Sequence, residues 1–477
     1  MNLSITYLAE PTPDKSVVYI IHADYPIEQL SFTKTEAAYI REQVKSNKNL
    51  IHINSYFKHS FVLVIADKQT NDNRENIRNQ GNEICEMVNT HNLSRLMIDD
   101  RTDIEFAWQD LTESIALSNY QFTKYIKNPQ KNTLTHLEIF SNQADKTKIK
   151  SLTATLEGVY FARDLINEPH SHLNALNFPE ALKAKFKNTS LTLDTLHLKQ
   201  LESLKMGGLL AVNKGSELGP SFTIVEWKPA EPINSKPIVL VGKGVMFDTG
   251  GVSIKSAKGM EDMKSDMAGA AAVAGTMLNL ALSGAAFHVI ALIPATDNRP
   301  GKSAYVPQDV IYMHDGTSVE VLNTDAEGRM ILADALSYAK QYKPQLVIEL
   351  STLTGSAEIA VGIKAIAAMG NTNDHMETLK KAGFACYERI AELPFWDDYK
   401  TLLKSDIAEL KNVGGKNAGA ITAGKFLEHF TDYPFIHLDI AGPAYLETKD
   451  SYRGKNGTGV GVRLLNEFFY YLSKQQN

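Results

Sequence analysis

Short apolar runs alternate with segments of helical spacing over the first third of the chain. The runs rich in β-branched residues, which predict strands, lie at 16–22, 61–66 and 95–98. Apolar residues spaced three and four apart predict helices at 73–89 and 104–119. Strands that alternate with helices are typical of an α/β domain.

A long helical pattern at 148–167 ends at Glu168-Pro169, because the residue before a proline rarely adopts the helical conformation. We expect this helix to connect two domains. Beyond it, apolar runs again alternate with helical patterns. The runs that predict buried strands lie at 191–196, 222–227, 238–241, 287–293, 346–350 and 436–440.

The length of 477 residues exceeds what one ordinary hydrophobic core accommodates, which favours two domains. We therefore predict an α/β protein with an N-terminal α/β domain at 1–147, a connecting helix at 148–169 and a larger C-terminal domain at 170–477. In the larger domain we expect a central mixed sheet flanked by helices.

One stretch, 267–294, contains no Asp, Glu, Lys or Arg and is long enough to cross a bilayer. Asn279, Ser283-Gly284 and His288 interrupt it. We interpret it as a small-residue helix at 268–282 followed by a buried strand at 287–293, and we expect no membrane contact.

Net charge and cysteine content argue against further classes of protein. The net charge of −6 argues against a general polyanion binder. The two cysteines, Cys85 and Cys386, suit a reducing compartment and exclude a cysteine-rich zinc module. Residues 1–16 have no basic segment followed by an apolar run, so we expect no signal peptide. In residues 1–150 the sequence indicates no phosphate loop, metal cluster or catalytic constellation.

The most distinctive run is Asn323-Thr324-Asp325-Ala326-Glu327-Gly328-Arg329. Its two carboxylates project together if the segment is extended, and carboxylates this close are tolerated when water or cations hold them. Arg329 is then expected to open a helix at 330–342. An acidic helix start would explain the carboxylates but not the arginine. Oxygen ligands of this kind suit Mg²⁺, Mn²⁺ or Zn²⁺.

Further groups of the same kind lie upstream of this run. The segment 241–251 leads from an apolar strand into a glycine-rich turn that presents Lys243 and Asp248. It lacks the spacing of a phosphate loop, and Asp248 would repel a phosphate. A purely structural turn is the alternative.

Three more candidates for the functional site each have an alternative, purely structural interpretation. Lys255 is either a site residue or a solvated surface lysine. Asp266 is either a site residue or the N-cap of the small-residue helix. The segment 351–355, which follows a predicted strand, is either a substrate-binding loop or a plain turn.

Together these runs resemble the leucyl, or cytosol, aminopeptidase family. The run at 323–329 is that family's signature as it stands. The other matching parts are 241–251, 253–255, Asp266, 352–355, 418–423, 437–442 and 459–463. The likeness extends from about Arg163 to Leu465, and several independent motifs in the same order make it specific. Residues 1–150 carry no recognisable part of it.

The resemblance implies an aminopeptidase with two divalent metal ions per subunit, Zn²⁺ or Mn²⁺, with Mg²⁺ as a further option. Carried over by motif, the ligands of one ion are Lys243, Asp248, Asp266 and Glu327. Those of the other are Asp248, Asp325 and Glu327, with the backbone carbonyl of Asp325. A lysine ligand must be neutral, and neighbouring cations lower its pKa.

The resemblance also implies the roles of the catalytic groups. A water activated by the two metals attacks the peptide carbonyl, since metal coordination lowers the pKa of water towards neutrality. Lys255 polarises that carbonyl and stabilises the oxyanion. A bicarbonate on Arg329 is the general base, and a metal takes the free α-amine of the substrate, which restricts cleavage to N-termini.

The motifs around the pocket for the substrate side chain depart mildly from the family. Thr249 stands where serine is usual, Ser351 where alanine is common, and Pro443-Ala444-Tyr445 ends its motif atypically. The resemblance places in this pocket Met263, Thr352, Leu353, Gly355 and Ala441. Small and apolar walls suit a Leu-like or Met-like residue.

The sequence thus predicts a cytoplasmic, metal-dependent aminopeptidase that acts on peptides and, as the resemblance implies, forms a homohexamer. Two alternatives stay open: a dipeptidase of the same family, for example one that cleaves Cys-Gly, and a DNA-binding regulator that uses the N-terminal domain. Residues 1–150 carry 17 Lys and Arg against 19 Asp and Glu, and this slightly acidic balance argues against nucleic acid. A scaffold without chemistry would not need the complete ligand set.

Overall fold

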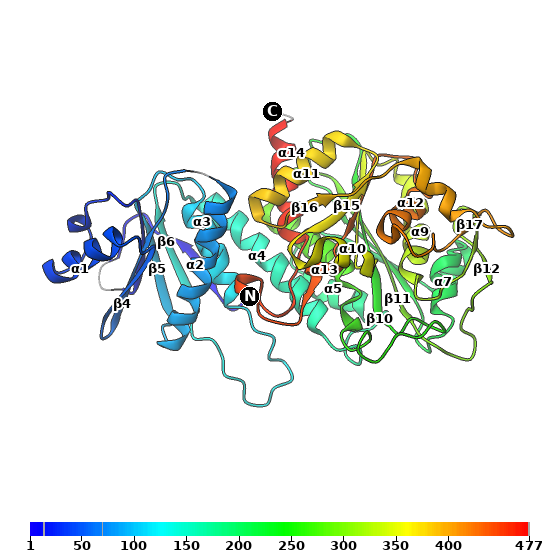
Figure 1. Cartoon of the computed structure of the whole chain (residues 1–477), viewed down its shortest axis with the longest axis horizontal. Helices are drawn as coiled ribbons and strands as arrows, with labels where there is room; N and C mark the ends of the chain where they lie inside the picture. Colours follow the sequence, from blue (N-terminus) through cyan, green and yellow to red (C-terminus); the bar gives the residue numbers. More distant parts are fainter. Residues whose placement is uncertain (13–14, 69, 476–477) are drawn as a thin grey trace. The chain divides into compact units, whose positions relative to one another are not determined.

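The computed structural model describes residues 1–12, 15–68 and 70–475, and the chain divides into two compact units. The first consists of Met1–Leu156 and Thr448–Gly454, and the second of Glu157–Glu447 and Lys455–Asn477. Helix α4, Lys146–Asn167, belongs in part to each (Figure 1). The predicted α/β class is confirmed, whereas the domain limits drawn from the sequence stay a prediction.

Six strands form the sheet of the first unit, in the order β1-β6-β5-β2-β4-β3. Neighbours are parallel except at the edge, where β3 is antiparallel to β4. The strands are β1 Ser4–Tyr7, β2 Val17–Ile21, β3 Leu50–Ser55, β4 Lys58–Val64, β5 Arg95–Asp100 and β6 His136–Ser141. The three strands predicted in this region are therefore confirmed as β2, β4 and β5.

Helices cover both faces of this sheet. They are α1 Lys34–Lys45, α2 Asn71–Thr90 and α3 Ala107–Ser118, with a 3₁₀ turn η1 at Ile27–Gln29. Ala37 and Ile40 of α1 share a core cluster with Val17 and Ile21 of β2, while α2 and α3 pack side by side. Arg74 of α2 joins these two helices through an ion pair with Asp110 of α3, at 2.7 Å.

The first unit also includes a segment from near the end of the chain, Thr448–Gly454. Its 3₁₀ turn η6, Ser451–Arg453, packs against α2 and α3. Tyr452 is only 1% exposed, and its hydroxyl donates to Glu75 at 2.9 Å. The sequence pattern did not predict this arrangement, because more than 350 residues separate the two partners.

Nine strands form the main sheet of the second unit, in the order β16-β15-β18-β14-β9-β11-β8-β7, with β10 paired to β11. The centre from β18 to β11 is parallel, whereas β15 and β8 run antiparallel to their central neighbours, so the expected mixed sheet is confirmed. The strands are β7 Thr192–His197, β8 Ser221–Trp227, β9 Ile238–Gly242, β10 Gly244–Asp248, β11 Val289–Asn298, β14 Leu346–Ser351, β15 Ile366–Gly370, β16 Ile390–Glu392 and β18 Phe435–Asp439.

Two groups of helices flank this sheet (Figure 1). Helices α7 Gly207–Asn213, α9 Glu327–Ala339 and α12 Gly419–Glu428 contribute to one core cluster with Val239 and Val241 of β9. Helices α8 Ala268–Ser283, α11 Asn373–Cys386 and α14 Val462–Gln475 form the other group. The smaller helical elements are α5 Phe178–Phe186, α6 Leu198–Ser203, α10 Gly355–Val361, α13 Ala441–Ala444, η2 Met263–Ser265, η3 Lys340–Tyr342, η4 Gly362–Lys364 and η5 Asp397–Leu403.

Two small sheets complete the second unit. One contains β12 Val310–Tyr312, β13 Ser318–Glu320 and β17 Leu410–Lys411. The other pairs β19 Tyr445–Leu446 with β20 Asn456–Gly457. Strand β19 precedes the segment Thr448–Gly454 of the first unit, and β20 follows it. Their pairing therefore holds the two ends of that segment together.

The uncharged stretch 267–294 contains α8 and the first part of β11, as the sequence indicated. The strand begins at Val289 rather than at 287 and continues to Asn298. Among the described residues, no helix combines the length and the apolar character that spanning a membrane requires.

Helix α8 crosses α4 closely, with a glycine on each helix at the crossing. A Cβ atom added at Gly158 would lie 2.5 Å from the carbonyl oxygen of Gly275, and one added at Gly275 would lie 2.5 Å from that of Gly158. Two side chains with Cβ atoms do not fit at such a crossing.

We expect Gly158→Ala to lower the melting temperature by roughly 2–6 °C, measured by differential scanning fluorimetry. Overpacking costs about 1–3 kcal/mol, which exceeds the gain of about 0.5–1 kcal/mol that alanine normally brings to a helix. Gly219→Ala is the control, because its Cβ would meet only Leu176 Cδ2, at 3.7 Å. Equal melting temperatures for the two variants would contradict the close crossing.

Candidate functional site

Polar side chains gather where the central strands of the second unit end. Lys243 follows β9, Asp248 ends β10, Asn298 ends β11, Thr352 follows β14 and Asp439 ends β18. The carboxyl ends of parallel strands meet at one edge of a sheet, which is where α/β proteins bind ligands. The parallel centre of this sheet therefore brings together residues that lie up to almost 200 positions apart in the chain.

The distinctive run reaches the same edge through a turn and the start of α9. Thr324 and Asp325 lie in the turn, where the backbone N–H of Asp325 donates to Asn323 Oδ1 at 2.9 Å. Helix α9 begins at Glu327. The expected extended segment is therefore wrong, and Arg329 lies within the first helical turn rather than before it. The physical reason is the side-chain hydrogen bond of Asn323, which favours a turn over an extended strand.

Gly328 has a steric role in this arrangement. A Cβ atom at this position would lie 2.4 Å from Cε and 2.7 Å from Nζ of Lys243. A side chain at this position would therefore force the end of the Lys243 side chain to move away from Asp266 and Glu327.

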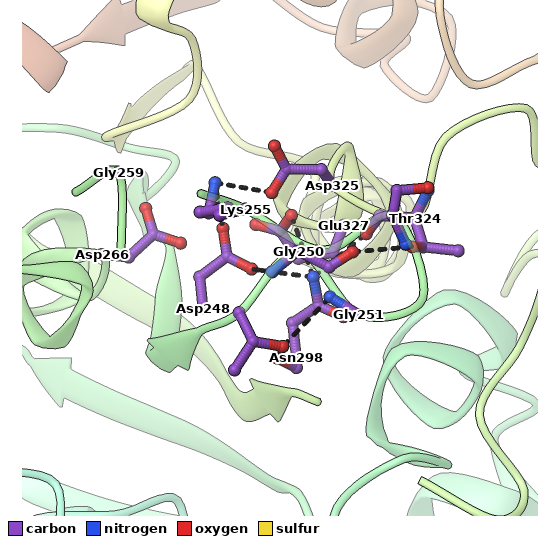
Figure 2. Close-up of polar contacts among 12 residues, drawn as sticks. Asp248, Gly250, Gly251, Lys255, Gly259, Asp266, Asn298, Thr324, Asp325 and Glu327 are labelled. Carbon is purple, nitrogen blue, oxygen red and sulfur yellow. Dashed lines mark hydrogen bonds and ion pairs between the residues drawn. The ribbon is translucent and has the colours of Figure 1, made fainter. Parts of the chain in front are cut away.

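Two lysines hold the carboxylates of the site, and Figure 2 shows one of them, Lys255, beside Asp248 and Asp325. Lys243 Nζ lies 2.8 Å from Asp266 and 2.9 Å from Glu327, and its side chain is 3% exposed. Lys255 Nζ lies 2.8 Å from Asp248 and its side chain is 18% exposed. The same Nζ lies 2.5 Å from Asp325 Oδ1. The alternative that Lys255 is a solvated surface lysine is therefore wrong.

Asp266 is oriented by site residues and not by helix capping. It accepts hydrogen bonds from Lys243 Nζ at 2.8 Å and from Thr352 Oγ1 at 2.7 Å. The N-cap of α8 is Met267, which makes no side-chain capping bond. The capping alternative is therefore wrong, because the ammonium of Lys243 is the stronger partner for the carboxylate.

Asp248 is fixed by two donors that sequence reasoning did not assign. Its Oδ1 accepts from the backbone N–H of Gly250 and from Asn298 Nδ2, both at 2.8 Å (Figure 2). Asn298 also donates to the carbonyl oxygen of Thr324 at 3.0 Å, so one amide joins β10 to the distinctive run. The signal in the sequence was an asparagine four residues after the uncharged stretch 267–294.

Burial and mutual repulsion raise the pKa values of the carboxylates. Burial and the neighbouring Asp248 raise the pKa of Glu327 to about 8. Burial raises the pKa of Asp266 to about 6, although Lys243 opposes the shift. Burial and Asp248 likewise raise the pKa of Asp325. The ionised forms of these three carboxylates are therefore disfavoured in the protein alone.

The neighbouring carboxylates raise the pKa values of the two lysines. Burial by itself would lower the pKa of Lys243, but Asp266 and Glu327 raise it above its usual value. Asp248 does the same for Lys255. In the protein alone, both side chains are therefore ammonium counterions of the carboxylates.

Arg329 is buried next to this cluster. Its Nη1 donates to the carbonyl oxygen of Asn412 at 2.7 Å, and burial lowers its pKa to about 10. Its Nε is buried and has no hydrogen-bond partner among the described residues. A buried guanidinium with a free N–H is suited to a small anion.

The residues expected in the side-chain pocket lie in loops at the same edge. Thr352 and Leu353 follow β14, Gly355 begins α10, Ala441 begins α13 and Met263 begins η2. Leu353 is partly buried against the core of the unit.

Asp439, which the sequence reasoning left without a role, connects two of these loops. Its carboxylate accepts from Leu353 N at 3.1 Å, from Thr354 Oγ1 at 2.8 Å and from Ala441 N at 3.2 Å. The loops after β14 and β18 are therefore held together by one buried side chain.

A family model described as the cytosol aminopeptidase family, catalytic domain, matches residues 160–466. The chain belongs to the cytosol aminopeptidase family. All the candidate residues, from Lys243 to Ala441, lie inside the matched region.

Relatives in the cytosol aminopeptidase family are close in sequence. A probable cytosol aminopeptidase of Chlorobaculum parvum is 50% identical over 307 residues, which cover 64% of this chain and 61% of that protein. One of Geobacter sulfurreducens is 42% identical over 366 residues, 75% of this chain and 74% of that protein. The chain thus spans less than two thirds of the length of the Chlorobaculum relative.

A solved structure extends the similarity over both units. The bottromycin maturation enzyme BotP, determined in complex with Mn, matches 96% of this chain and 99% of its own. The TM-score is 0.85 at 26% sequence identity. The similarity to BotP therefore includes the N-terminal region that the model of the cytosol aminopeptidase catalytic domain leaves unmatched.

Proposed function

We propose that the chain is a metal-dependent aminopeptidase that removes N-terminal residues, with a preference for Leu-like side chains, from peptides. The observation that carries this proposal is the group Asp248, Asp325 and Glu327, in which one oxygen of each lies within 4.8 Å of the others. Lys255 borders the same group.

The donor set fits two divalent ions. Four carboxylates face two lysines, and burial together with repulsion from Asp248 raises the pKa values of Glu327 and Asp266. Hard carboxylate oxygens with few nitrogen donors suit Mn²⁺ and Zn²⁺, and also Mg²⁺. The residues that would hold the ions are Lys243, Asp248, Asp266, Asp325 and Glu327. When bound, such ions polarise a carbonyl group and lower the pKa of water.

Lys255 is the group best placed to act on the substrate carbonyl. Its side chain is partly exposed, whereas Lys243 is buried. An ammonium at the border of the carboxylate group can donate to the carbonyl oxygen and stabilise the oxyanion that forms during attack. Its partners Asp248 and Asp325 keep it protonated, as the raised pKa indicates.

Arg329 is proposed to hold a bicarbonate that acts as general base. The buried guanidinium and its free Nε–H supply the charge and the donor that a small planar anion requires. The loops that Asp439 connects would then form the side-chain pocket, with Thr352, Leu353, Gly355, Ala441 and Met263. We also propose assembly as a homohexamer and a cytoplasmic location, in keeping with the family.

We expect removal of metal to abolish hydrolysis of leucine p-nitroanilide. The full chain is dialysed against EDTA, metal content is measured by mass spectrometry, and kcat is expected to fall at least about 100-fold, equal to about 2.7 kcal/mol. Readdition of Mn²⁺ or Zn²⁺ should restore it. N-acetyl-leucine p-nitroanilide, which lacks a free amine, is the control and should not be cleaved at any stage.

Two outcomes would change this proposal. Full activity in protein shown to be metal-free would contradict a metal-dependent reaction. Cleavage of Cys-Gly without cleavage of longer peptides would replace the aminopeptidase by the dipeptidase alternative.

A further inference from the structure

A second group of metal-ligating side chains lies in the first unit, where the sequence indicated none. His52, His59 and His91 each offer one ring nitrogen, and these nitrogens lie within 4.8 Å of one another. The sequence pattern of residues 1–150 did not indicate this group. The candidate active site belongs to the second unit, so this group is separate from it.

The sheet register explains why His52 and His59 meet. In the antiparallel pair of β3 and β4, His52 is opposite Phe61, and Asn54 is opposite His59. His52 and His59 are thus diagonal neighbours on one face of the sheet.

The third histidine reaches this face through the helix that follows β4. Because β4, β2 and β5 are parallel, α2 must run back along the sheet between β4 and β5. Its C-cap is His91, which therefore lies near the beginning of β4. Spacings of seven and 32 residues match no sequential metal motif, and this is why the sequence did not reveal the group.

The ring positions are close to those of metal ligands. His52 Nε2 and His59 Nδ1 are 2.9 Å apart. Two nitrogens bound to one tetrahedral ion at about 2.0–2.1 Å would be roughly 3.3 Å apart. The His91 ring centroid lies 4.3 Å from that of His59 and 5.5 Å from that of His52. The three ligand nitrogens lie within 4.8 Å of one another, close enough to face one ion.

The surroundings hold the rings in place and keep one side open. The Phe61 ring stacks on His52 with centroids 4.6 Å apart and planes 8° apart. His59 is 4% exposed, whereas His91 is exposed to solvent.

We propose that His52, His59 and His91 bind one Zn²⁺ ion, with a solvent molecule as the fourth ligand on the side of His91. Three imidazoles prefer Zn²⁺ over the Mn²⁺ and Mg²⁺ that suit a carboxylate site. The ion would join β3, β4 and the end of α2, and it would therefore stabilise the edge of the sheet in the first unit.

The first test compares the Zn²⁺ content of full-length variants. Metal-free protein is equilibrated with Zn²⁺, passed through a desalting column, and analysed by mass spectrometry. We expect His91→Asn to retain one Zn²⁺ fewer per chain than the unmodified protein. His136→Asn, which changes a histidine of β6 in the same unit, is the control and should retain the full number.

Two further variants make the outcome independent of folding defects and of the active site. His52→Gln changes a second ligand and should also lose one Zn²⁺, with an unchanged circular dichroism spectrum. Glu327→Gln should lose Zn²⁺ from the active site alone, so that the double variant with His91→Asn shows the sum of the two losses. Equal Zn²⁺ content in His91→Asn, His52→Gln and the unmodified protein would overturn the proposal, whatever the result for Glu327→Gln.

A second measurement identifies the ligand atoms. With Cu²⁺ as the probe, electron paramagnetic resonance should show a signal with splitting from imidazole nitrogens, and this signal should disappear in His91→Asn. A signal that persists unchanged in this variant would show that Cu²⁺ is bound elsewhere and would also overturn the proposal.

Discussion

In the Glu327→Ala variant, kcat for leucine p-nitroanilide is expected to fall at least about 10³-fold, which corresponds to an increase of about 4 kcal/mol in the activation free energy. The variant is also expected to lose bound metal. Glu327 is 1% exposed, begins α9 and contacts Lys243 at 2.9 Å. It belongs to both proposed ligand sets, so its removal weakens the binding of both ions. The measurements are kcat and metal content per chain.

The variant should nevertheless remain folded. Burial and the charge of Asp248 raise the pKa of Glu327 to about 8, which means that its ionised form is disfavoured in the protein without metal. Removing this carboxylate relieves repulsion from Asp248, while Lys243 keeps its ion pair with Asp266. Circular dichroism should therefore be unchanged. Glu377→Ala, which removes an exposed carboxylate of α11, is the control. Full activity in Glu327→Ala would make the proposed metal site wrong.

The Lys255→Ala variant should keep its metal and lose about 10²–10³-fold in kcat, as expected when one donor to an oxyanion is removed. The ammonium lies 2.8 Å from Asp248 and 2.5 Å from Asp325, and it is the more exposed of the two lysines in the site. Its contribution is made in the transition state, so KM should change little.

The Lys243→Ala variant should differ from Lys255→Ala in its metal content. This lysine is 3% exposed and is proposed as a ligand, so its removal should lower metal content along with activity. Lys258→Ala, in the exposed loop after Lys255, should affect neither. Loss of metal in Lys255→Ala would mean that Lys255 is itself a ligand, and the proposed division of roles between the two lysines would be wrong.

Much of the fold could be predicted because its signals are local. Strands such as β9 and β14 are short, mainly apolar runs, and α8 is an uncharged run that begins with small residues. The errors occurred where a side chain decided the backbone. Asn323 makes a turn where an extended segment was expected, and the ion pair with Lys243 takes Asp266 away from helix capping.

The sequence by itself determined the α/β class, most of the strands and the residues proposed for the active site, because periodicity and a contiguous signature can be recognised within a few turns of chain. Only the tertiary structure decided which groups meet. Asn298 joins Asp248 to Thr324, and Asp439 connects two loops. The three histidines of the first unit meet in the same way. Such contacts depend on strand order, register and the return path of a helix, and no local pattern encodes them.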